Sequence, residues 1–376
     1  MPVLRVDYPG LLTTVQDLGR FGYQDLGVPV SGSMDSVQSR LANILIGNSE
    51  NDAVLEITIL GPKLIFLEDV IVALTGADLS PRLNGEAIVR WQPINVKKGS
   101  ELSFGECRDG ARGYLAVSGN GFNVPIVMGS RSTYLPGNFG GYHGRALQKG
   151  DVLSSISANH NPETKLMPSE FVEPNYADIK DIRIVIGSRE NFSISELDKL
   201  YNSDYKISND SDRVGYLLEG SLIEINNSSD IISEGNAPGA IQVSGDGVMT
   251  ILLSDKGTIG GYSKIASVIN ADLNLLAQLM PGDSISFTEV SLDEARNAFI
   301  RQEKFIEHVV LGTDFNSKIY KSSVKIDGDL LEVVSDDGEI FSYSSLQNES
   351  TKKSQFAAEI HVEDEIFNLD AEIENN

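Results

Sequence analysis

The chain has 376 residues, 41% of them apolar, which is enough for two or three domains with a substantial core. It carries 54 acidic and 30 basic side chains, a formal net charge of −24, which argues against binding to nucleic acid or anionic membranes. No apolar run approaches the ~20 residues that span a bilayer, and the N-terminal residues do not read as a signal peptide. The single cysteine, Cys107, excludes an internal disulfide and a cysteine-cluster metal site, and we read it as a bystander. We therefore expect a soluble, cytoplasmic protein.

Short, β-branched apolar runs closed by Gly, Asp, Asn or Pro dominate the sequence, a pattern typical of sandwiches and barrels. The clearest predicted strands are Lys63–Phe66, Val70–Leu74, Tyr114–Val117, Ile182–Ile186, Ile241–Val243 and Thr250–Leu253. Helical periodicity predicts a few short helices, at Asp35–Ile46, Ala271–Leu279 and Ser291–His308. The sequence therefore predicts a mainly β fold.

A weak internal repeat indicates that the fold contains two related β-barrels. Residues 60–66 resemble residues 219–225, and residues 99–104 resemble residues 282–287. The interval between the two matches is longer in the second copy, which predicts an insertion there.

The chain divides accordingly. We predict a first barrel at 1–155, a linker at 156–181, a second barrel at 182–290, and a helix, hairpin and acidic tail of unknown role at 291–376. The hairpin spans 318–334, and the tail from Glu359 onward is predicted to be solvated and partly disordered. We expect residues 301–376 to be dispensable for folding of the barrels.

A first polar cluster occupies residues 13–24. There Thr14, Gln16, Asp17 and Arg20 place a hydroxyl, an amide, a carboxylate and a guanidinium on a loop that contains glycine. Such a loop can present several donors and one acid to a ligand. The alternative is an ion pair between Asp17 and Arg20 that stabilises a turn.

A second cluster, residues 129–145, contains two arginines, two tyrosines and five glycines. Ser130, Arg131, Tyr134 and Arg145 are its candidate ligand-binding residues, because glycine permits close backbone approach and Arg binds carboxylate or phosphate in a bidentate manner. His143 is either an acid–base group or a structural histidine. A glycine-rich loop on a barrel rim is the structural alternative.

A third cluster lies between residues 233 and 264 and supplies Glu234, Gln242, Asp246, Tyr262 and Lys264 from successive strand ends. Asp246 stands between two glycines, so a simple hairpin turn remains open there. No Walker-type phosphate loop, complete Rossmann fingerprint, zinc-protease motif or nucleophile elbow is present.

Long motifs in series carry a family resemblance: Thr14-Val15-Gln16-Asp17-x-Gly19-Arg20, Ser33-Met34-Asp35, Ser130–Tyr134, Gly140–Asp151, Arg213–Tyr216, Ala237–Val243 and Gly260–Ala266. Over about residues 1–290 the chain resembles the allophanate hydrolase subunit 2 family, also called the Kip-antagonist family, which includes the C subunit of 5-oxoprolinase. The resemblance implies cyclophilin-like barrels. It also implies a heteromeric complex with a subunit 1 or Kip-inhibitor-type protein and a third subunit of the lactam-utilisation type.

The implied reaction is the ATP-driven opening of 5-oxo-L-proline, a small-molecule substrate, to L-glutamate. A lactam is a poor electrophile, so its carbonyl must be activated before water attacks. We expect Asp17, Arg131, Glu234 and Lys264 to be catalytic, without a metal. The predicted substrate-binding residues are Thr14, Gln16, Arg20, Ser130, Tyr134, Arg145, Gln242, Asp246 and Tyr262.

The four cations Arg20, Arg131, Arg145 and Lys264 are expected to converge on one cleft between the barrels, with Asp17 and Glu234 lining it. Because the chain lacks a phosphate loop, we expect ATP to be shared with, or held by, the partner subunits. No Met-Lys-Met occurs, so we expect no covalent biotin on this chain.

Two other functions remain open at the level of sequence. The same family pair, when fused, forms the carboxyltransferase part of urea carboxylase, so a biotin-dependent carboxyltransferase subunit of the urea carboxylase or allophanate type is one alternative. A non-catalytic regulator of a kinase inhibitor is the other. The family usually has Gln-Thr-Thr before Gly-Gly-Tyr-Pro, whereas this chain has Gly257-Thr258-Ile259 and Ser263, which leaves the substrate uncertain.

Overall fold

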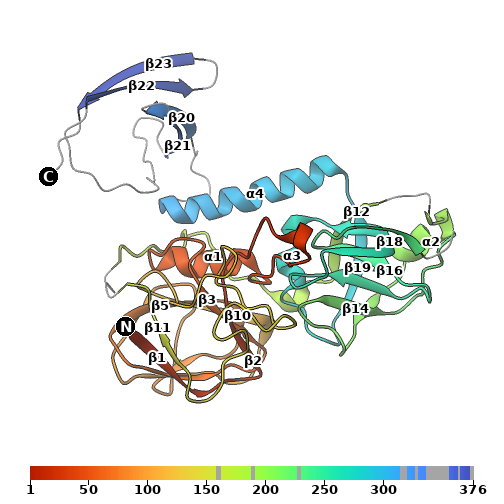
Figure 1. Cartoon of the computed structure of the whole chain (residues 1–376), viewed down its shortest axis with the longest axis horizontal. Coiled ribbons are helices and arrows are strands. Elements are labelled where there is room, and N and C mark those ends of the chain that lie inside the picture. The colour runs from red at the N-terminus through yellow and green to blue at the C-terminus, as the bar shows by residue number, and fades with distance from the viewer. Residues whose placement is uncertain are drawn as a thin grey trace. The chain divides into compact units, whose positions relative to one another are not determined.

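The structure is a computed structural model that describes residues 1–157, 162–187, 191–226, 230–313, 320–326, 329–335, 355–362 and 365–372 (Figure 1). The chain forms two compact units. One comprises Met1–Met167 with Phe171–Val309, and the other comprises Pro168–Glu170 with Val310–Asn376. Both predicted barrel regions lie in the first unit, and the mainly β prediction is confirmed. In the described part of the chain, no helix is long and apolar enough to cross a membrane.

The first subdomain consists of two sheets that enclose one apolar core. One sheet has the order β11-β1-β4-β9-β6-β7, with β1 Pro2–Tyr8, β4 Lys63–Phe66, β6 Arg82–Leu83, β7 Glu86–Ala87, β9 Glu101–Ser103 and β11 Val152–Ser154. The other has the order β2-β3-β10-β5-β8, with β2 Leu12–Gln16, β3 Val54–Thr58, β5 Val70–Asp78, β8 Ile94–Val96 and β10 Asp109–Val117. A short 3-10 turn, η1, spans Gln24–Leu26.

Strand β10 is buried on both faces, and the two-residue period of a strand sorts its side chains. Leu115 and Val117 enter the core between the sheets, whereas Tyr114 and Ala116 face helix α1, Ser36–Leu45. The helix begins where Asp35 accepts a hydrogen bond from the Gln38 N–H, which is the expected helix almost to the residue.

The second subdomain contains a closed barrel. Seven strands follow the order β12-β19-β13-β14-β17-β16-β18, and β18 pairs back onto β12, while β15 adds to β18 outside the ring. Their bounds are β12 Asp181–Ile186, β13 Tyr205–Ile207, β14 Gly215–Glu219, β15 Asp230–Gly235, β16 Ala240–Val243, β17 Met249–Leu252, β18 Ile259–Val268 and β19 Ser284–Glu289. The 3-10 turn η2 (Tyr176–Asp178) precedes the barrel, and helices α2 (Ile194–Tyr201) and α3 (Asn270–Leu276) accompany it.

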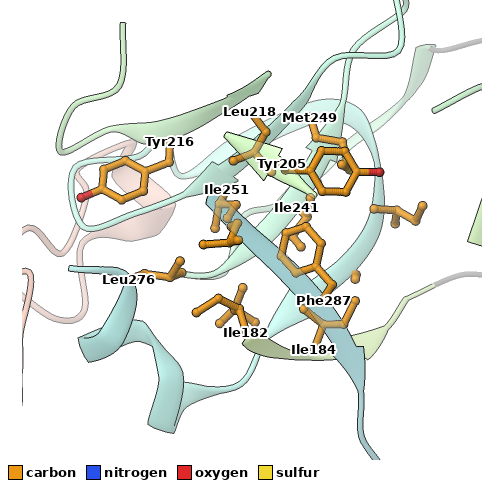
Figure 2. Packing of buried hydrophobic residues seen from close by; sticks show 14 of the residues in the cluster. Ile182, Ile184, Tyr205, Tyr216, Leu218, Ile241, Met249, Ile251, Leu276 and Phe287 are labelled. Carbon is orange, nitrogen blue, oxygen red and sulfur yellow. The ribbon is translucent and has the colours of Figure 1, made fainter. Parts of the chain in front are cut away.

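The barrel interior is filled by branched aliphatic and aromatic side chains, among them Ile184, Tyr205, Ile251 and Phe287 (Figure 2). Leu276 of α3 is fully buried in this cluster. Met34, from the loop before α1, also packs into it, so the first subdomain contributes a side chain to the core of the second.

Helix α4, Leu292–Leu311, packs against both subdomains (Figure 1). It begins with a capping box, in which the Glu294 N–H donates to the Ser291 hydroxyl and the Ser291 N–H donates to the Glu294 carboxylate. Ala298 packs with Ile269 and Ala271 of the second subdomain.

The other end of α4 packs on the first subdomain, where Ile306 and Val309 contact a cluster that contains Leu41 and Trp91. The expectation that residues 301–376 are dispensable is therefore wrong for the second half of α4, because both side chains are buried in the fold.

The second unit holds strands β20 Tyr320–Ile326, β21 Asp329–Ser335, β22 Gln355–Val362 and β23 Glu365–Glu372, in the order β21-β20-β22-β23. Pairing of Ile326 with Asp329 confirms the predicted hairpin, although its two turn residues lie outside the described part. Partial disorder is expected for the acidic tail, but residues 355–362 and 365–372 of this region form paired strands. The amino-acid sequence of these segments alternates apolar with polar residues, which favours strands.

We predict that a chain ending at residue 313 unfolds cooperatively near the melting temperature of the full protein, whereas a chain ending at residue 300 does not. The shorter chain lacks Ile306 and Val309, and the loss of each large buried aliphatic side chain costs about 2–5 kcal/mol. Thermal melts followed by circular dichroism measure the difference. Equal melting temperatures for the two truncated chains would show that the C-terminal half of α4 contributes nothing to the fold.

Candidate functional site

The Asp17 carboxylate joins the first two predicted clusters. It is buried and accepts hydrogen bonds from the N–H groups of Gly19 (2.9 Å) and Arg131 (2.5 Å), and from the hydroxyls of Ser130 (2.7 Å) and Ser132. Three of these donors bond to Oδ1 and one bonds to Oδ2, so the carboxylate serves mainly to hold residues 130–132. The geometry assigns Asp17 a positioning role instead of the expected catalytic one.

The Arg20 guanidinium is 1% exposed and lies where the two clusters meet. Its Nη2 donates to the Ser132 carbonyl at 2.7 Å, its Nε donates to the Val127 carbonyl at 3.4 Å, and the Phe139 ring centre is 4.9 Å from Cζ. Nη1 has no hydrogen-bond partner in the described part of the chain. Burial lowers the pKa of Arg20, against the longer-range opposing effect of Asp17.

No ion pair between Arg20 and Asp17 occurs among the described residues, so the turn-stapling pair considered from the sequence is absent. The clusters at 13–24 and 129–145 are nevertheless brought together as expected: Asp17 accepts hydrogen bonds from Ser130 and Arg131, and Arg20 donates one to the Ser132 carbonyl.

Most of the remaining predicted residues of these clusters bond to, or pack against, other residues of the first subdomain. Gln16 Nε2 donates to the Thr14 hydroxyl at 3.0 Å and to the Thr133 carbonyl at 3.2 Å. Tyr134 packs edge-on against Phe139, and burial raises its pKa. The Arg131 side chain is half-buried, and its Nε has no partner among the described residues.

Arg145 and Lys264 each pair with an acid of their own subdomain. The two Nη atoms of Arg145 donate to the Asp151 carboxylate at 2.7 and 2.9 Å. Lys264 Nζ lies 2.6 Å from Glu234 Oε1. No contact in the described part of the chain joins Lys264 to Arg20. The expectation that four cations converge on one cleft between the barrels is therefore wrong: local carboxylates already neutralise Arg145 and Lys264, and none of the four cations lines the cleft between the two subdomains.

The other members of the third cluster lie around the Lys264 pair or in a turn. Gln242 Nε2 donates to Asn236 Oδ1 at 3.1 Å, and Tyr262 is half-exposed. The Asp246 carboxylate accepts from the Ser244 hydroxyl at 2.5 Å, and this bond lowers the pKa of Asp246. Asp246 thus occupies the hairpin turn that was the structural alternative.

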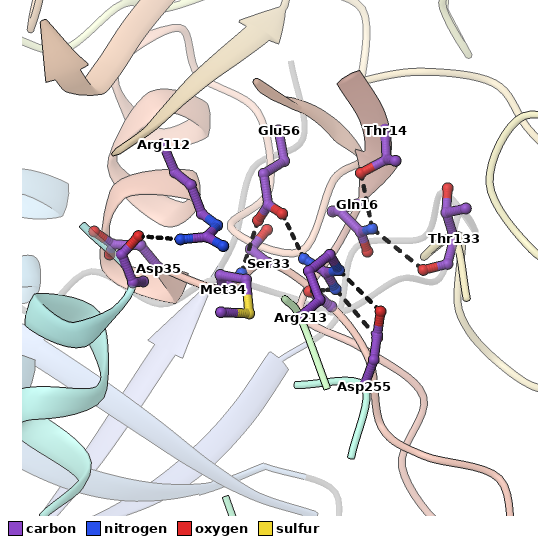
Figure 3. A network of polar contacts seen from close by, with 12 residues as sticks. Thr14, Gln16, Ser33, Met34, Asp35, Glu56, Arg112, Thr133, Arg213 and Asp255 are labelled. Carbon is purple, nitrogen blue, oxygen red and sulfur yellow. Dashed lines mark hydrogen bonds and ion pairs between the residues drawn. The ribbon is translucent and has the colours of Figure 1, made fainter. Parts of the chain in front are cut away.

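A buried polar network that the sequence did not reveal connects the two subdomains (Figure 3). Arg213 donates from Nη1 to Glu56, from Nε to Asp255 at 2.9 Å, and from Nη2 to the Gly32 carbonyl at 2.7 Å. Glu56 and Gly32 belong to the first subdomain, whereas Arg213 and Asp255 belong to the second. Burial by itself would lower the pKa of Arg213, but the two carboxylates outweigh it and raise that pKa.

The register of the sheet explains why Glu56 reaches the second subdomain. Glu56 on β3 lies opposite Thr14 on β2 and Tyr114 on β10, so the three side chains share the face that points away from the barrel core. The Tyr114 hydroxyl donates to Glu56 at 2.9 Å and accepts from the Asp35 N–H at 2.8 Å. The available sequence signal was a lone acid in an otherwise apolar strand.

Asp35 extends the network toward α3. Gln278 Nε2 donates to its carboxylate at 2.8 Å, and Gln278 in turn accepts from the N–H groups of Ala111 and Arg112. Burial raises the pKa of Asp35 to about 7, in spite of these hydrogen bonds, and the nearby Glu56 acts in the same direction.

A cleft of about 490 Å³ opens between the two subdomains next to this network. The first subdomain contributes Leu18, Phe21 and Ser33, the second contributes Leu253 and Asn274, and α4 contributes Phe299, Gln302 and Glu303. Such a volume is ordinary for a small-molecule site. None of the predicted site residues lines the cleft, although Leu18 and Phe21 come from the first predicted cluster.

The charges at the rim of the cleft are already balanced. The two Nη atoms of Arg40 donate to the Glu303 carboxylate at 2.7 and 2.8 Å, and its Nε donates to Glu50 Oε2 at 2.6 Å. The arginine in the lining is thus held by two acids, and the rest of the lining is mostly apolar, hydroxyl-bearing or amide-bearing. The described residues contain no group of three or more His, Cys, Asp or Glu side chains that could hold a metal ion.

Comparisons with known proteins place these features in a family context. A family model described as "Carboxyltransferase domain, subdomain A and B" matches residues 26–289. The 5-oxoprolinase C subunit of Escherichia coli (strain K12) is 35% identical over 308 residues, which cover 82% of this chain and 97% of that protein. The urea amidolyase of Saccharomyces cerevisiae is 34% identical over 316 residues, 78% of this chain but only 17% of that protein.

Among solved structures, the urea amidolyase of K. lactis superposes on 96% of this chain and 22% of its own, with a TM-score of 0.77 and 31% sequence identity. The chain thus spans less than a quarter of the urea amidolyases that it resembles, but nearly the full length of the E. coli protein.

We predict that Arg213→Met destabilises the protein by about 3–5 kcal/mol, because it leaves the buried Glu56 and Asp255 carboxylates without their cation. Arg145→Met is the control, since its partly exposed pair with Asp151 contributes at most about 1 kcal/mol. Chemical denaturation measures both losses. Equal losses for the two variants would contradict the special role of Arg213.

We also predict a pH dependence from Asp35. Its pKa is raised from 3.8 to about 7 on folding, so its stabilising contribution is complete below pH 3.8 and is lost as the pH rises toward 7. The Asp35→Asn variant lacks this titration, so its deficit in unfolding free energy relative to the wild type should shrink across that window. Denaturation of both proteins at several pH values tests this, and a constant difference would contradict it.

Proposed function

We propose a function from one premise: the chain belongs to the carboxyltransferase domain family, subdomain A and B. On that premise, it is a subunit of an ATP-dependent 5-oxoprolinase complex that opens 5-oxo-L-proline to L-glutamate. The observation that carries this proposal is coverage, because the chain matches 97% of one 5-oxoprolinase C subunit and 94% of another, at 35% and 34% identity. A subunit 1 or Kip-inhibitor-type protein and a lactam-utilisation-type protein are the proposed partners.

The chemistry assigns roles to residues of this chain. The lactam carbonyl must be activated before water can attack, and positive groups that stabilise developing oxyanion charge are the main catalytic need. The pair of Lys264 and Glu234 suits such a role, because Glu234 is half-exposed and a substrate carboxylate can replace it at Lys264 Nζ. We propose Lys264 as the catalytic cation and Glu234 as the group that holds it before the substrate binds, with ATP as the energy source, shared with or held by the partners.

A carboxyltransferase of the urea carboxylase type is the second candidate, and one observation favours it. The K. lactis urea amidolyase structure superposes on 96% of the chain, with a TM-score of 0.77. In this alternative the chain moves a carboxyl group from a partner's carboxybiotin to a urea nitrogen.

We predict that the purified chain alone releases no glutamate from 5-oxo-L-proline and ATP, and that activity appears when both partner subunits are added. The reason is that the chain has no phosphate loop and that 5-oxoproline hydrolysis here needs groups from more than one subunit. Glutamate formation measured with each combination of subunits checks this. Urea carboxylation in the presence of a carboxybiotin carrier, without glutamate release, would favour the second candidate.

Lys264→Met should lower the activity of the reconstituted complex more than tenfold, about 1.4 kcal/mol of transition-state stabilisation, with little change in melting temperature. Lys97→Met is a matched control, because Lys97 also pairs with an acid, Asp69, at 2.8 Å on the surface of the first subdomain. Equal activities of the two variants would remove Lys264 from the proposed site.

A further inference from the structure

The glycine-rich loop 138–144 has an unusual backbone. Five of its seven residues have φ in the left-handed region, at Asn138 (53°), Gly140 (71°), Gly141 (51°), His143 (57°) and Gly144 (69°). Two of the glycines are required by contact as well. A Cβ on Gly140 would lie 2.0 Å from the Ser132 carbonyl oxygen, and one on Gly141 would lie 1.8 Å from the Thr133 hydroxyl. The loop therefore packs closely against Ser132 and Thr133, in the segment to which Asp17 and Arg20 are hydrogen-bonded.

This backbone leaves several donors unused. Within the described chain, no oxygen accepts a hydrogen bond from the N–H groups of Gly140, Tyr142 or His143. Successive N–H groups in turns that combine right-handed and left-handed residues form concave sites that bind anions. A cavity of about 390 Å³ lies against the loop, and Asn123 and Asn138 are among the residues that line it.

The cation Arg20 stands behind this cavity. It contacts three residues of the lining, through its hydrogen bond to the Val127 carbonyl, its position over the Phe139 ring, and the close approach of its Nη2 to Gly140. Its Nη1 is buried without a partner, and no carboxylate forms an ion pair with it in the part of the chain that is described. In a water-poor interior, one such charge acts strongly on a nearby anion.

We propose that the cavity beside loop 138–144 binds a phosphoryl group, with the loop N–H groups and the Asn138 amide as donors and Arg20 as the compensating charge. A phosphoryl group has three terminal oxygens. The three loop N–H groups and the Asn138 amide therefore suit it better than they suit a carboxylate, which has two oxygens. The inference goes beyond the proposed function, which assigns no ligand to this loop. It does not require that reaction to be correct.

The test uses the purified full chain and isothermal titration with inorganic phosphate, ADP and acetate. We expect saturable binding of phosphate or ADP at one site, and weaker binding of acetate. Asn138→Gly removes one amide donor without backbone strain and should weaken binding about fivefold, the loss of one hydrogen bond. Asn120→Gly is the matched control, because Asn120 is also exposed and left-handed (φ 64°) but does not line the cavity, so its affinity should equal that of the wild type.

Arg20→Gln should abolish binding, and because this variant also loses structural hydrogen bonds, the Asn138 and Asn120 pair decides the question. Tighter binding of ADP than of phosphate identifies a nucleotide as the source, and equal binding identifies free phosphate. The proposal is overturned if neither phosphate nor ADP binds, if acetate binds as tightly as phosphate, or if Asn138→Gly binds like the wild type. Because this test needs no partner subunit, its failure is independent of the glutamate assay.

Discussion

The buried Arg213 guanidinium fixes how the two subdomains meet. It takes one carboxylate from the first subdomain, Glu56, and one from the second, Asp255, and all three side chains are at most 5% exposed. The desolvation of such charges is costly and is compensated only when every partner is in position. The triad therefore contributes specificity of placement more than net stability, because any other placement of the subdomains would leave a buried charge unpaired.

The shape of the cleft between the subdomains follows from this constraint. Its walls include the loop around Ser33 and the turn at Leu253 and Ser254, and Arg213 holds both segments through Gly32 and Asp255. Helix α4 completes the lining from residues between its two points of attachment. A residue that never touches the cleft thus determines its geometry, so a substitution at the junction can change a bound ligand's environment without contacting the ligand.

The sequence predicted the features that depend on local signals. Strand alternation, turn residues and helical periodicity predicted the strands and the first helix, and the polar clusters around Asp17 and Arg131 do meet. The pairing of cations was not predictable, because Lys264 and Glu234 are 30 residues apart and their contact depends on the register of β15 and β18. Glu56 was missed because an acid in a strand ordinarily faces solvent, whereas this one is buried among Tyr114, Met34 and Arg213.

The ion pairs distinguish the cations that are already neutralised from a cation that has no ionic partner in the described part of the chain. In a chain of net charge −24, acids are abundant enough to neutralise Arg40, Arg145 and Lys264 locally. Arg20 is buried without an ion pair in the described part, although Asp17 lies close enough to affect its pKa. The Asp17 carboxylate accepts its four hydrogen bonds from Gly19 and residues 130–132, and it forms no ion pair with Arg20 in the described part of the chain. Long-range repulsion by so acidic a surface opposes the approach of any anion, so occupancy of the loop must depend on short-range donors and on this one charge.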